Sequence, residues 1–300
     1  MRVLVTADWH VGGTRPRCRL DEDWIGTQEA DILAVWKIAE EQRADSIWIL
    51  GDLFDTPRVS TEAVNMVLRA FEKAPCEIRI LCGNHDLPYH NFGELERSSI
   101  GIVLHKYKML ASDPKVFLAA YPFGTEPEYA PLSAEMQEKG EFIWATHRLT
   151  FPNATFRPVE GIGYLAQDLL DGCPAARLIM TGDYHHAFDY VGPDGRRVIT
   201  PGCLNIQDAD MADYQPMVFI LETADLFVKK VPLPVQGRVT TAYLEQEHAA
   251  AEMRQSFIAA LSSGRISMRT FSAALAEKMA AAPEGVRRIL DEVAESFVKN

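Results

Sequence analysis

Residues 2–10 read RVLVTADWH, and this stretch decides how the fold is understood. Val3, Leu4 and Val5 form an apolar run typical of a buried strand, and Asp8 and His10 follow at its end. Because alternate residues of an extended chain point the same way, these two side chains are expected to face one edge of a sheet together. Whether they form a site depends on the strand ends that follow.

Strand-like and helix-like runs alternate through the first part of the chain. The strand-like runs RVLVTAD, SIWILGD and EIRILCG are separated by the helix-like runs EADILAVWKIAEEQ and TEAVNMVLRAFEK, as in successive βαβ units. Further strands are predicted at KVFLAAYP, EFIWATH, RLIMTGD, RVITPG, MVFILET and FVKKVPL. The sequence therefore predicts an α/β fold, a layered β-sandwich flanked by helices.

The character of the sequence changes near residue 239. Residues 1–238 show no linker or repeat and are expected to form one domain, whereas residues 239–300 are rich in Ala, Glu, Met and Arg. Apolar residues recur there at helical spacing, from Phe257 and Leu261 to Leu290 and Phe297. We expect a helical C-terminal region that packs on itself or on the main domain, or that docks a partner or a second copy of the chain as a homodimer.

Composition limits the classes of protein that the chain can represent. The formal net charge of −12 argues against a uniformly basic surface for nucleic acid, although local basic patches stay open. The sequence contains no apolar run of the roughly 18 residues that a membrane-spanning helix needs, and no signal segment precedes the first strand. The five cysteines are scattered along the chain, as is usual for reduced thiols. We therefore expect a cytoplasmic protein that has no membrane partner.

Ligand-type residues stand at several predicted strand ends. Functional sites of open α/β sheets gather at the carboxyl ends of strands, so these residues are expected to converge on one site. The residues are Asp8 and His10 in ADWH, Asp52 and Asp55 in GDLFD, Asn84, His85 and Asp86 in GNHD, His147 in ATH, and Asp183 and His185 in TGDYH. Each pattern alone is weak, whereas the joint occurrence in this order is specific.

This set of motifs resembles that of the calcineurin-like metallophosphoesterases, over about residues 1–235. ADWHVGG, GDLFDTPR and GNHD are most similar to the SbcD-type nucleases of DNA repair, which work with an SbcC-type ATPase. The resemblance implies the metallophosphoesterase fold and hydrolysis of phosphodiester bonds by water activated at two metal ions.

The resemblance also implies the ligands of two divalent ions, Mn²⁺ or else Mg²⁺. One ion would be held by Asp8, His10, Asp52 and His185, and the other by Asp52, Asn84, His147 and Asp183. The family pattern has a histidine where this chain has Asp183. A carboxylate there would favour hard cations, and the alternative is a second ion that is weakly held or absent.

Two further residues receive catalytic roles from the resemblance. His85 would protonate the leaving alkoxide, since a histidine is partly protonated near neutral pH. Asp55 would orient His85, or would be an ordinary turn carboxylate.

The substrate is expected to be DNA, cut exonucleolytically on double strands and endonucleolytically on single strands. Arginine forks fit phosphate oxygens, so candidate backbone contacts are Arg15, Arg17, Arg19, Arg58 and Arg148. The chain is short for the nuclease subgroup and lacks an obvious capping domain. One alternative is therefore a phosphodiesterase or phosphatase of the same fold with a small substrate, and another is a scaffold without catalysis.

Overall fold

The computed structural model describes residues 1–126, 142–234, 239–242 and 253–255. The chain divides into two compact units, Met1–Val239 and Thr240–Asn300. Nearly all of the second unit lies outside the described residues, so the helical region expected over residues 239–300 stays a prediction. The first unit carries both sheets and the ligand-type residues.

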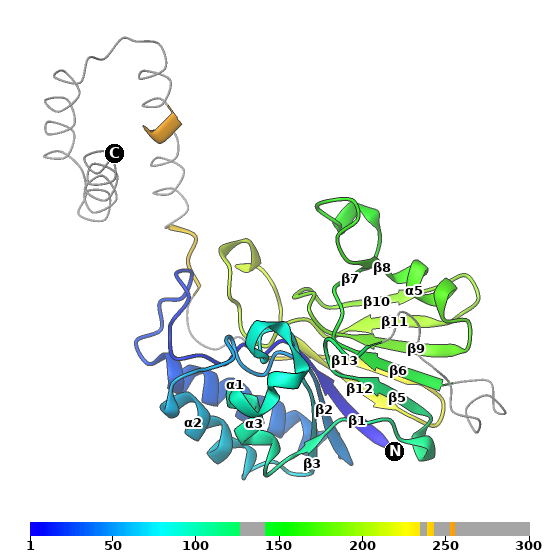
Figure 1. Cartoon of the computed structure of the whole chain (residues 1–300), viewed down its shortest axis with the longest axis horizontal. Coiled ribbons are helices and arrows are strands. Elements are labelled where there is room, and N and C mark those ends of the chain that lie inside the picture. Colours follow the sequence, from blue (N-terminus) through cyan, green and yellow to red (C-terminus); the bar gives the residue numbers. More distant parts are fainter. Residues whose placement is uncertain (127–141, 235–238, 243–252, 256–300) are drawn as a thin grey trace, which may run out of the picture. The chain divides into compact units, whose positions relative to one another are not determined.

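Two sheets form the centre of the first unit (Figure 1). The first has the order β13-β12-β1-β2-β3-β4, with β13 (Phe227–Pro232), β12 (Met217–Glu222), β1 (Arg2–Thr6), β2 (Ser46–Leu50), β3 (Glu77–Leu81) and β4 (Lys108–Met109). The second has the order β10-β11-β9-β6-β5, with β10 (Phe188–Val191), β11 (Arg197–Thr200), β9 (Ala176–Thr181), β6 (Phe142–Thr146) and β5 (Leu118–Tyr121). A small third sheet pairs β7 (Thr150–Phe151) with β8 (Tyr164–Leu165).

The helices cover the outer faces of the two large sheets. The α-helices are α1 (Trp24–Glu41), α2 (Thr61–Phe71), α3 (Ser99–Leu104) and α5 (Ala166–Gly172). Short 3₁₀ segments occupy the loops, namely η1 (Pro88–His90), η2 (Phe92–Arg97), η3 (Pro114–Val116), η4 (Ala154–Phe156) and η5 (Ala209–Met211). Figure 1 shows α1, α2 and α3 on one side of the first sheet and α5 beside the second.

The alternation along each strand produces the layers. On β1, Leu4 belongs to the core shared with α1 and α2, whereas Val3 and Val5 pack into the core between the sheets. On β6, Ile143 faces the first sheet, and Trp144 packs toward α5. The predicted layered α/β sandwich is confirmed.

The sequence missed the shorter elements. Strands β4, β7 and β8 have two residues each, too few for an alternating pattern, and β10 is a half-buried edge strand. Helices α3 and α5 have six and seven residues, less than two full turns each, and are also too short for a periodic signal. Within the described residues, no helix is long and apolar enough to cross a membrane.

Candidate metal centre

The loops after β1 and β2 run side by side at the carboxyl end of the first sheet. The amide of Asp8 donates to Gly51 O at 3.1 Å, and the amides of Trp9 and His10 both donate to Asp52 O, at 2.8 and 3.0 Å. Parallel pairing of β1 with β2 brings the two loops level. The motifs ADWH and GDLFD therefore meet because their backbones are joined directly.

The backbone of this region is strained at the ligand positions. Asp8, His10, Asp52 and Asp183 have φ values of 51°, 46°, 50° and 71°, in the left-handed region that non-glycine residues rarely adopt. The glycine before Asp52 is also required, because a Cβ on Gly51 would collide with the His147 ring. Such strain persists only where the surrounding structure fixes it, and it concentrates at functional sites.

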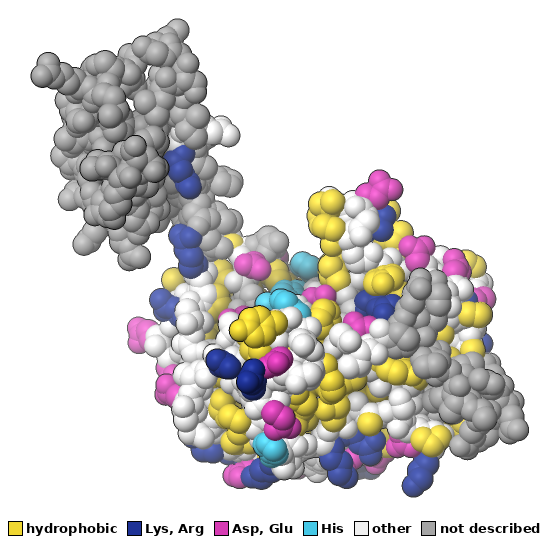
Figure 2. All heavy atoms as spheres, in the orientation of Figure 1, with side chains coloured by type: hydrophobic (Ala, Val, Ile, Leu, Met, Phe, Trp, Pro, Cys, Tyr) yellow, Lys and Arg dark blue, Asp and Glu magenta, His cyan; other side chains and the backbone are white. Residues whose placement is uncertain are grey.

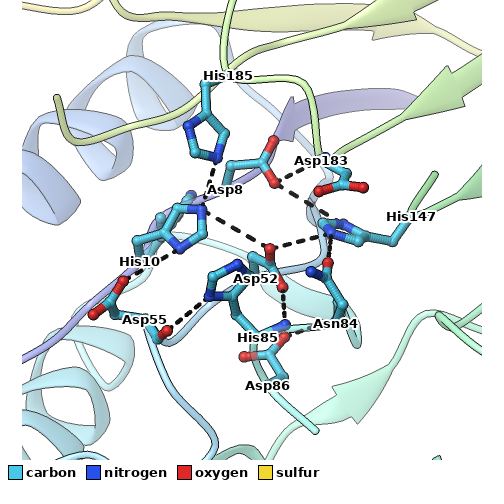
Figure 3. A network of polar contacts seen from close by, with 12 residues as sticks. Asp8, His10, Asp52, Asp55, Asn84, His85, Asp86, His147, Asp183 and His185 are labelled. Atoms are coloured by element: carbon cyan, nitrogen blue, oxygen red, sulfur yellow. Dashed lines mark hydrogen bonds and ion pairs between the residues drawn. The ribbon is translucent and has the colours of Figure 1, made fainter. Parts of the chain in front are cut away.

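Trp9 anchors the first ligand loop. Its buried ring lies 5.7 Å from Trp36 and 6.0 Å from Phe71, and its Nε1–H donates to Thr6 Oγ1 at 2.9 Å. With this side chain in the core, its two neighbours Asp8 and His10 turn to the opposite side, into the cluster shown in Figure 3.

Potential ligand atoms form three groups, in each of which all atoms lie within 4.8 Å of one another. The groups are Asp8 with His10 and His185, His10 with Asp52 and His85, and Asp8 with Asp52 and His147. His10 Nε2 lies 3.0 Å from His185 Nε2 and 3.9 Å from Asp52 Oδ2. The four residues predicted for the first ion are thus brought together.

His147 is the centre of the other side. Its Nδ1–H donates to Leu50 O at 2.7 Å, because a carbonyl can only accept, and this bond turns Nε2 toward the cluster. Nε2 then lies 2.9 Å from Asn84 Oδ1 and 3.2 Å from Asp52 Oδ2. Asp52 Oδ2 therefore stands between His10 and His147, where a carboxylate shared by two ions is expected.

Asp183 lies beside the cluster, but its carboxylate is not grouped with the other potential ligand atoms. Its backbone amide donates to Asp8 Oδ1 at 2.9 Å, and Figure 3 shows its carboxylate beside the His147 ring. Among the described residues, its carboxylate is absent from the groups whose ligand atoms all lie within 4.8 Å of one another. Its ligation of the second ion remains a prediction.

His85 lies at the exposed rim of the cluster, with its ring 4.9 Å from that of His10. Its Nδ1–H donates to the backbone carbonyl of Asp55 at 2.8 Å, which leaves Nε2 available to bind or release a proton. The main chain of Asp55 makes this contact, not its carboxylate, so the orienting role expected of the Asp55 side chain stays a prediction. The Asp55 carboxylate lies 3.7 Å from His10 Nδ1 instead, and burial raises its pKa.

The electrostatics of the cluster fit cations. Burial lowers the pKa of His10 to about 3, so this ring is neutral and ready to bind a cation. Burial would also lower the pKa of His147, but the charge of Asp52 outweighs it and holds that pKa well above its usual value. Asp8 Oδ2 is buried without a hydrogen-bond partner among the described residues. A cation bound in the cluster would satisfy this oxygen.

Two residues support the ligand loops without a sequence signal that gave them a role. The buried Asp86 carboxylate accepts from the amides of Gly83 and Phe54 at 2.9 Å and of Leu53 at 3.3 Å, which ties the β3 loop to the β2 loop. Burial raises the pKa of Asp86 to about 7. Asn205 donates from its side-chain amide to Trp9 O at 2.7 Å. Asp86 was visible in GNHD, whereas nothing in the sequence marked Asn205.

The five candidate arginines fall into two groups. Arg15, Arg17 and Arg58 are exposed. Arg19 is buried and ion-paired with Asp21 at 2.8 Å, and the buried Arg148 guanidinium lies over the Tyr164 ring at 4.5 Å. Figure 2 shows histidine side chains that reach the surface in the middle of the displayed face, next to an apolar side chain.

The clustered Asp and His side chains could together hold divalent cations. The family model described as Calcineurin-like phosphoesterase matches residues 1–141. This part of the chain is therefore similar to the calcineurin-like phosphoesterases, and the Asp and His clusters are candidate metal ligands.

Solved structures resemble the fold at low identity. A dimetal phosphatase from Danio rerio is 12% identical, with 80% of this chain and 98% of that chain covered and a TM-score of 0.49. A phosphoesterase from E. coli is 14% identical, with coverages of 78% and 100% and a TM-score of 0.37. An archaeal phosphodiesterase is 13% identical, with the same coverages and a TM-score of 0.38. Likeness at this level carries no argument about the fold, the activity or the substrate.

Proposed function

We propose that the chain is a Mn²⁺-dependent nuclease of the SbcD type that hydrolyses phosphodiester bonds of DNA. The convergence of Asp8, His10, Asp52, His147 and His185 on one cluster, with His85 exposed beside it, carries this proposal. The motif resemblance supports the nuclease subgroup, and Mg²⁺ is the alternative metal.

Each side chain of the site has a separate role in the proposed reaction. Bound divalent ions would supply a clamp for phosphate oxygens and a water of lowered pKa. Asp52 and His147 would hold them on the sheet side, and the Leu50 carbonyl keeps His147 in the required tautomer. His85 would protonate the leaving oxygen from Nε2, since Asp55 O holds its other ring nitrogen.

Substrate binding rests on few basic residues. Arg15, Arg17 and Arg58 are exposed and would contact phosphates without reading sequence, whereas Arg19 and Arg148 are buried and are not proposed as contacts. A chain with a net charge of −12 is poorly suited to hold a duplex alone. An SbcC-like ATPase partner in the cytoplasm, which would grip the DNA, is therefore part of the proposal.

The first test compares two substrates with Mn²⁺, an end-labelled linear duplex and bis(p-nitrophenyl) phosphate. His85→Ala should slow DNA cleavage by roughly 10²- to 10⁴-fold, the usual contribution of a general acid. It should slow hydrolysis of the nitrophenyl diester far less, because nitrophenolate leaves without a proton. Bound Mn²⁺, measured by equilibrium dialysis, should be unchanged.

His105→Ala is the matched control, because His105 is exposed at the end of α3 and pairs only with Glu96 in the described structure. Equal losses on both substrates would contradict the acid role. Hydrolysis of the small diester by the wild type, without cleavage of DNA at high protein concentration, would instead support the phosphodiesterase with a small substrate.

A further inference from the structure

Tyr89 is an unusual side chain in the loop that follows the GNHD motif. It is 90% exposed, the most exposed large apolar side chain of the described residues. Its backbone is left-handed, with φ 56° and ψ 23°, and His90 follows with φ 53°. Two successive non-glycine residues in this region are costly, and such strain is kept where a fixed geometry serves a function.

The turn around Tyr89 is firmly held. Leu87 and Pro88, just before it, are buried, and the amide of Asn91 donates to Pro88 O at 3.1 Å. The His90 ring, just after it, lies 6.2 Å from that of Phe123, which in turn lies 6.3 Å from the ring of His147. The buried Leu87 and Pro88 thus anchor the turn, and Tyr89 and His90 that follow them are exposed.

Tyr89 is also close to the candidate acid. Three residues lie between it and His85, so the Cα atoms of the two are at most about 14 Å apart when the chain is fully extended. The separation is shorter here, because the amide of Leu87 donates to Asn84 O at 3.3 Å and folds the chain back. The turn that carries Tyr89 therefore lies next to the candidate acid.

We propose that Tyr89 is a stacking platform for an unpaired base on the leaving-group side of the scissile phosphate. The inference rests on the proposed nuclease function and describes how that site would bind the nucleic-acid strand next to the scissile phosphate. A rigid, exposed aromatic ring binds any base through its π-face, so the contact carries no sequence preference. It also suits an acidic chain, because stacking needs no positive charge.

Dinucleoside monophosphates test the platform because each contains a single phosphodiester bond. The probes are thymidylyl-thymidine, the two analogues that lack one base, and the analogue that lacks both, with Mn²⁺ present. The hydrolysis products identify the leaving nucleoside. Tyr89→Ala should raise KM for the intact dinucleotide by roughly 5- to 100-fold with kcat nearly unchanged, and Tyr89→Phe should match the wild type.

The decisive result is whether the effect of Tyr89→Ala on KM depends on the leaving-side base of the substrate. The effect of Tyr89→Ala should vanish on the analogue without the leaving-side base and persist on the other single-base analogue. Phe227→Ala is the matched control, because Phe227 is 58% exposed at the far end of the first sheet, level with Arg2.

The melting temperature distinguishes a binding role of the Tyr89 ring from a structural one. Tyr89→Gly suits a φ of 56°, so its melting temperature should not fall below that of the wild type, although its KM should rise as in Tyr89→Ala. An effect that persists without the leaving-side base would overturn the platform. A wild type that hydrolyses none of the four probes and binds no single-stranded 10-mer would overturn the proposed function itself, before any variant is made.

Discussion

The two sheets contribute to the metal centre in different ways. The first sheet supplies Asp8, His10 and Asp52 from two loops that are joined by backbone hydrogen bonds, and Asn84 from a third loop that the Asp86 carboxylate ties to the second. The second supplies His147, Asp183 and His185. His147 reaches the first half through its ring, with Nδ1 bonded to Leu50 O and Nε2 beside Asn84 Oδ1 and Asp52 Oδ2. Asp183 reaches it through its amide, which donates to Asp8 Oδ1.

Burial follows this division only in part. Asp8 and Asp52 are fully buried and Asp183 and His185 are half-buried, but His147 of the second half is fully buried and Asn84 of the first half is not. The β1 and β2 loops of the first half are thus joined through the main chain, whereas the second half is held to it by side chains that can be changed one at a time. The following variants test this contrast.

Asp52→Asn should have the largest effect, because Asp52 Oδ2 faces both His10 and His147. Loss of the shared charge should remove both ions and slow hydrolysis of bis(p-nitrophenyl) phosphate by more than about 10³-fold, beyond the loss of one stabilising donor. Activity and bound Mn²⁺ are measured together. Asp168→Asn, an exposed change on α5, should alter neither, and retention of one tightly held ion in Asp52→Asn would refute the bridge.

Asp86→Asn tests the frame of the first half. An amide nitrogen there would face at least one of the backbone amides that now donate to Asp86, at a cost of about 1–3 kcal/mol in the free energy of unfolding. The pKa of about 7 in the folded chain lies above the unfolded value of about 3.8, so the stability contributed by this group is full below pH ~4. It is lost as the pH rises through 7.

The destabilisation of Asp86→Asn should therefore be larger at pH 5 than at pH 8, as measured by urea unfolding with a chelator present. Equal destabilisation at both values would contradict the raised pKa.

Asp183→Ala should affect one ion only, since Asp183 lies on the His147 side of the cluster. The affinity of the weaker Mn²⁺ site should fall by roughly 10- to 100-fold, the range for residues that support metal ligands, while the tighter site is unchanged. Calorimetric titration with Mn²⁺ resolves the two. Asp183→His, which restores the family pattern, should retain both ions, and unchanged binding in Asp183→Ala would remove Asp183 from the ligand set.

Metal binding should depend on pH through His147. Its raised pKa means that the metal-free ring is protonated at neutral pH, so a cation must displace that proton. Mn²⁺ affinity at the His147 side should therefore rise about tenfold per pH unit between pH 6 and 7. Titrations in buffers with different ionisation enthalpies should reveal one proton released, and affinity independent of pH would exclude this exchange.

The same contrast explains what the sequence could predict. Asp8, His10 and Asp52 follow apolar strands directly, so the fold class and the meeting of their loops could be inferred from periodicity and topology. Asp86 and Asn205 act through backbone groups that approach only after folding, and no local pattern marks such contacts. The burial of Arg19 and Arg148 was likewise hidden, because an arginine in a loop reads as exposed until its ion pair or aromatic partner is known.

The position of β1 in its sheet has a consequence for the life of the newly made chain. β1 pairs with β2 on one side and with β12 on the other, so Arg2 lies opposite Glu222. During synthesis, the first ligand loop thus lacks one neighbouring strand until more than two hundred further residues have left the ribosome. Pairing at such separation delays folding. The loop that carries Asp8 and His10 therefore gains its full support only when nearly the whole first unit has been made.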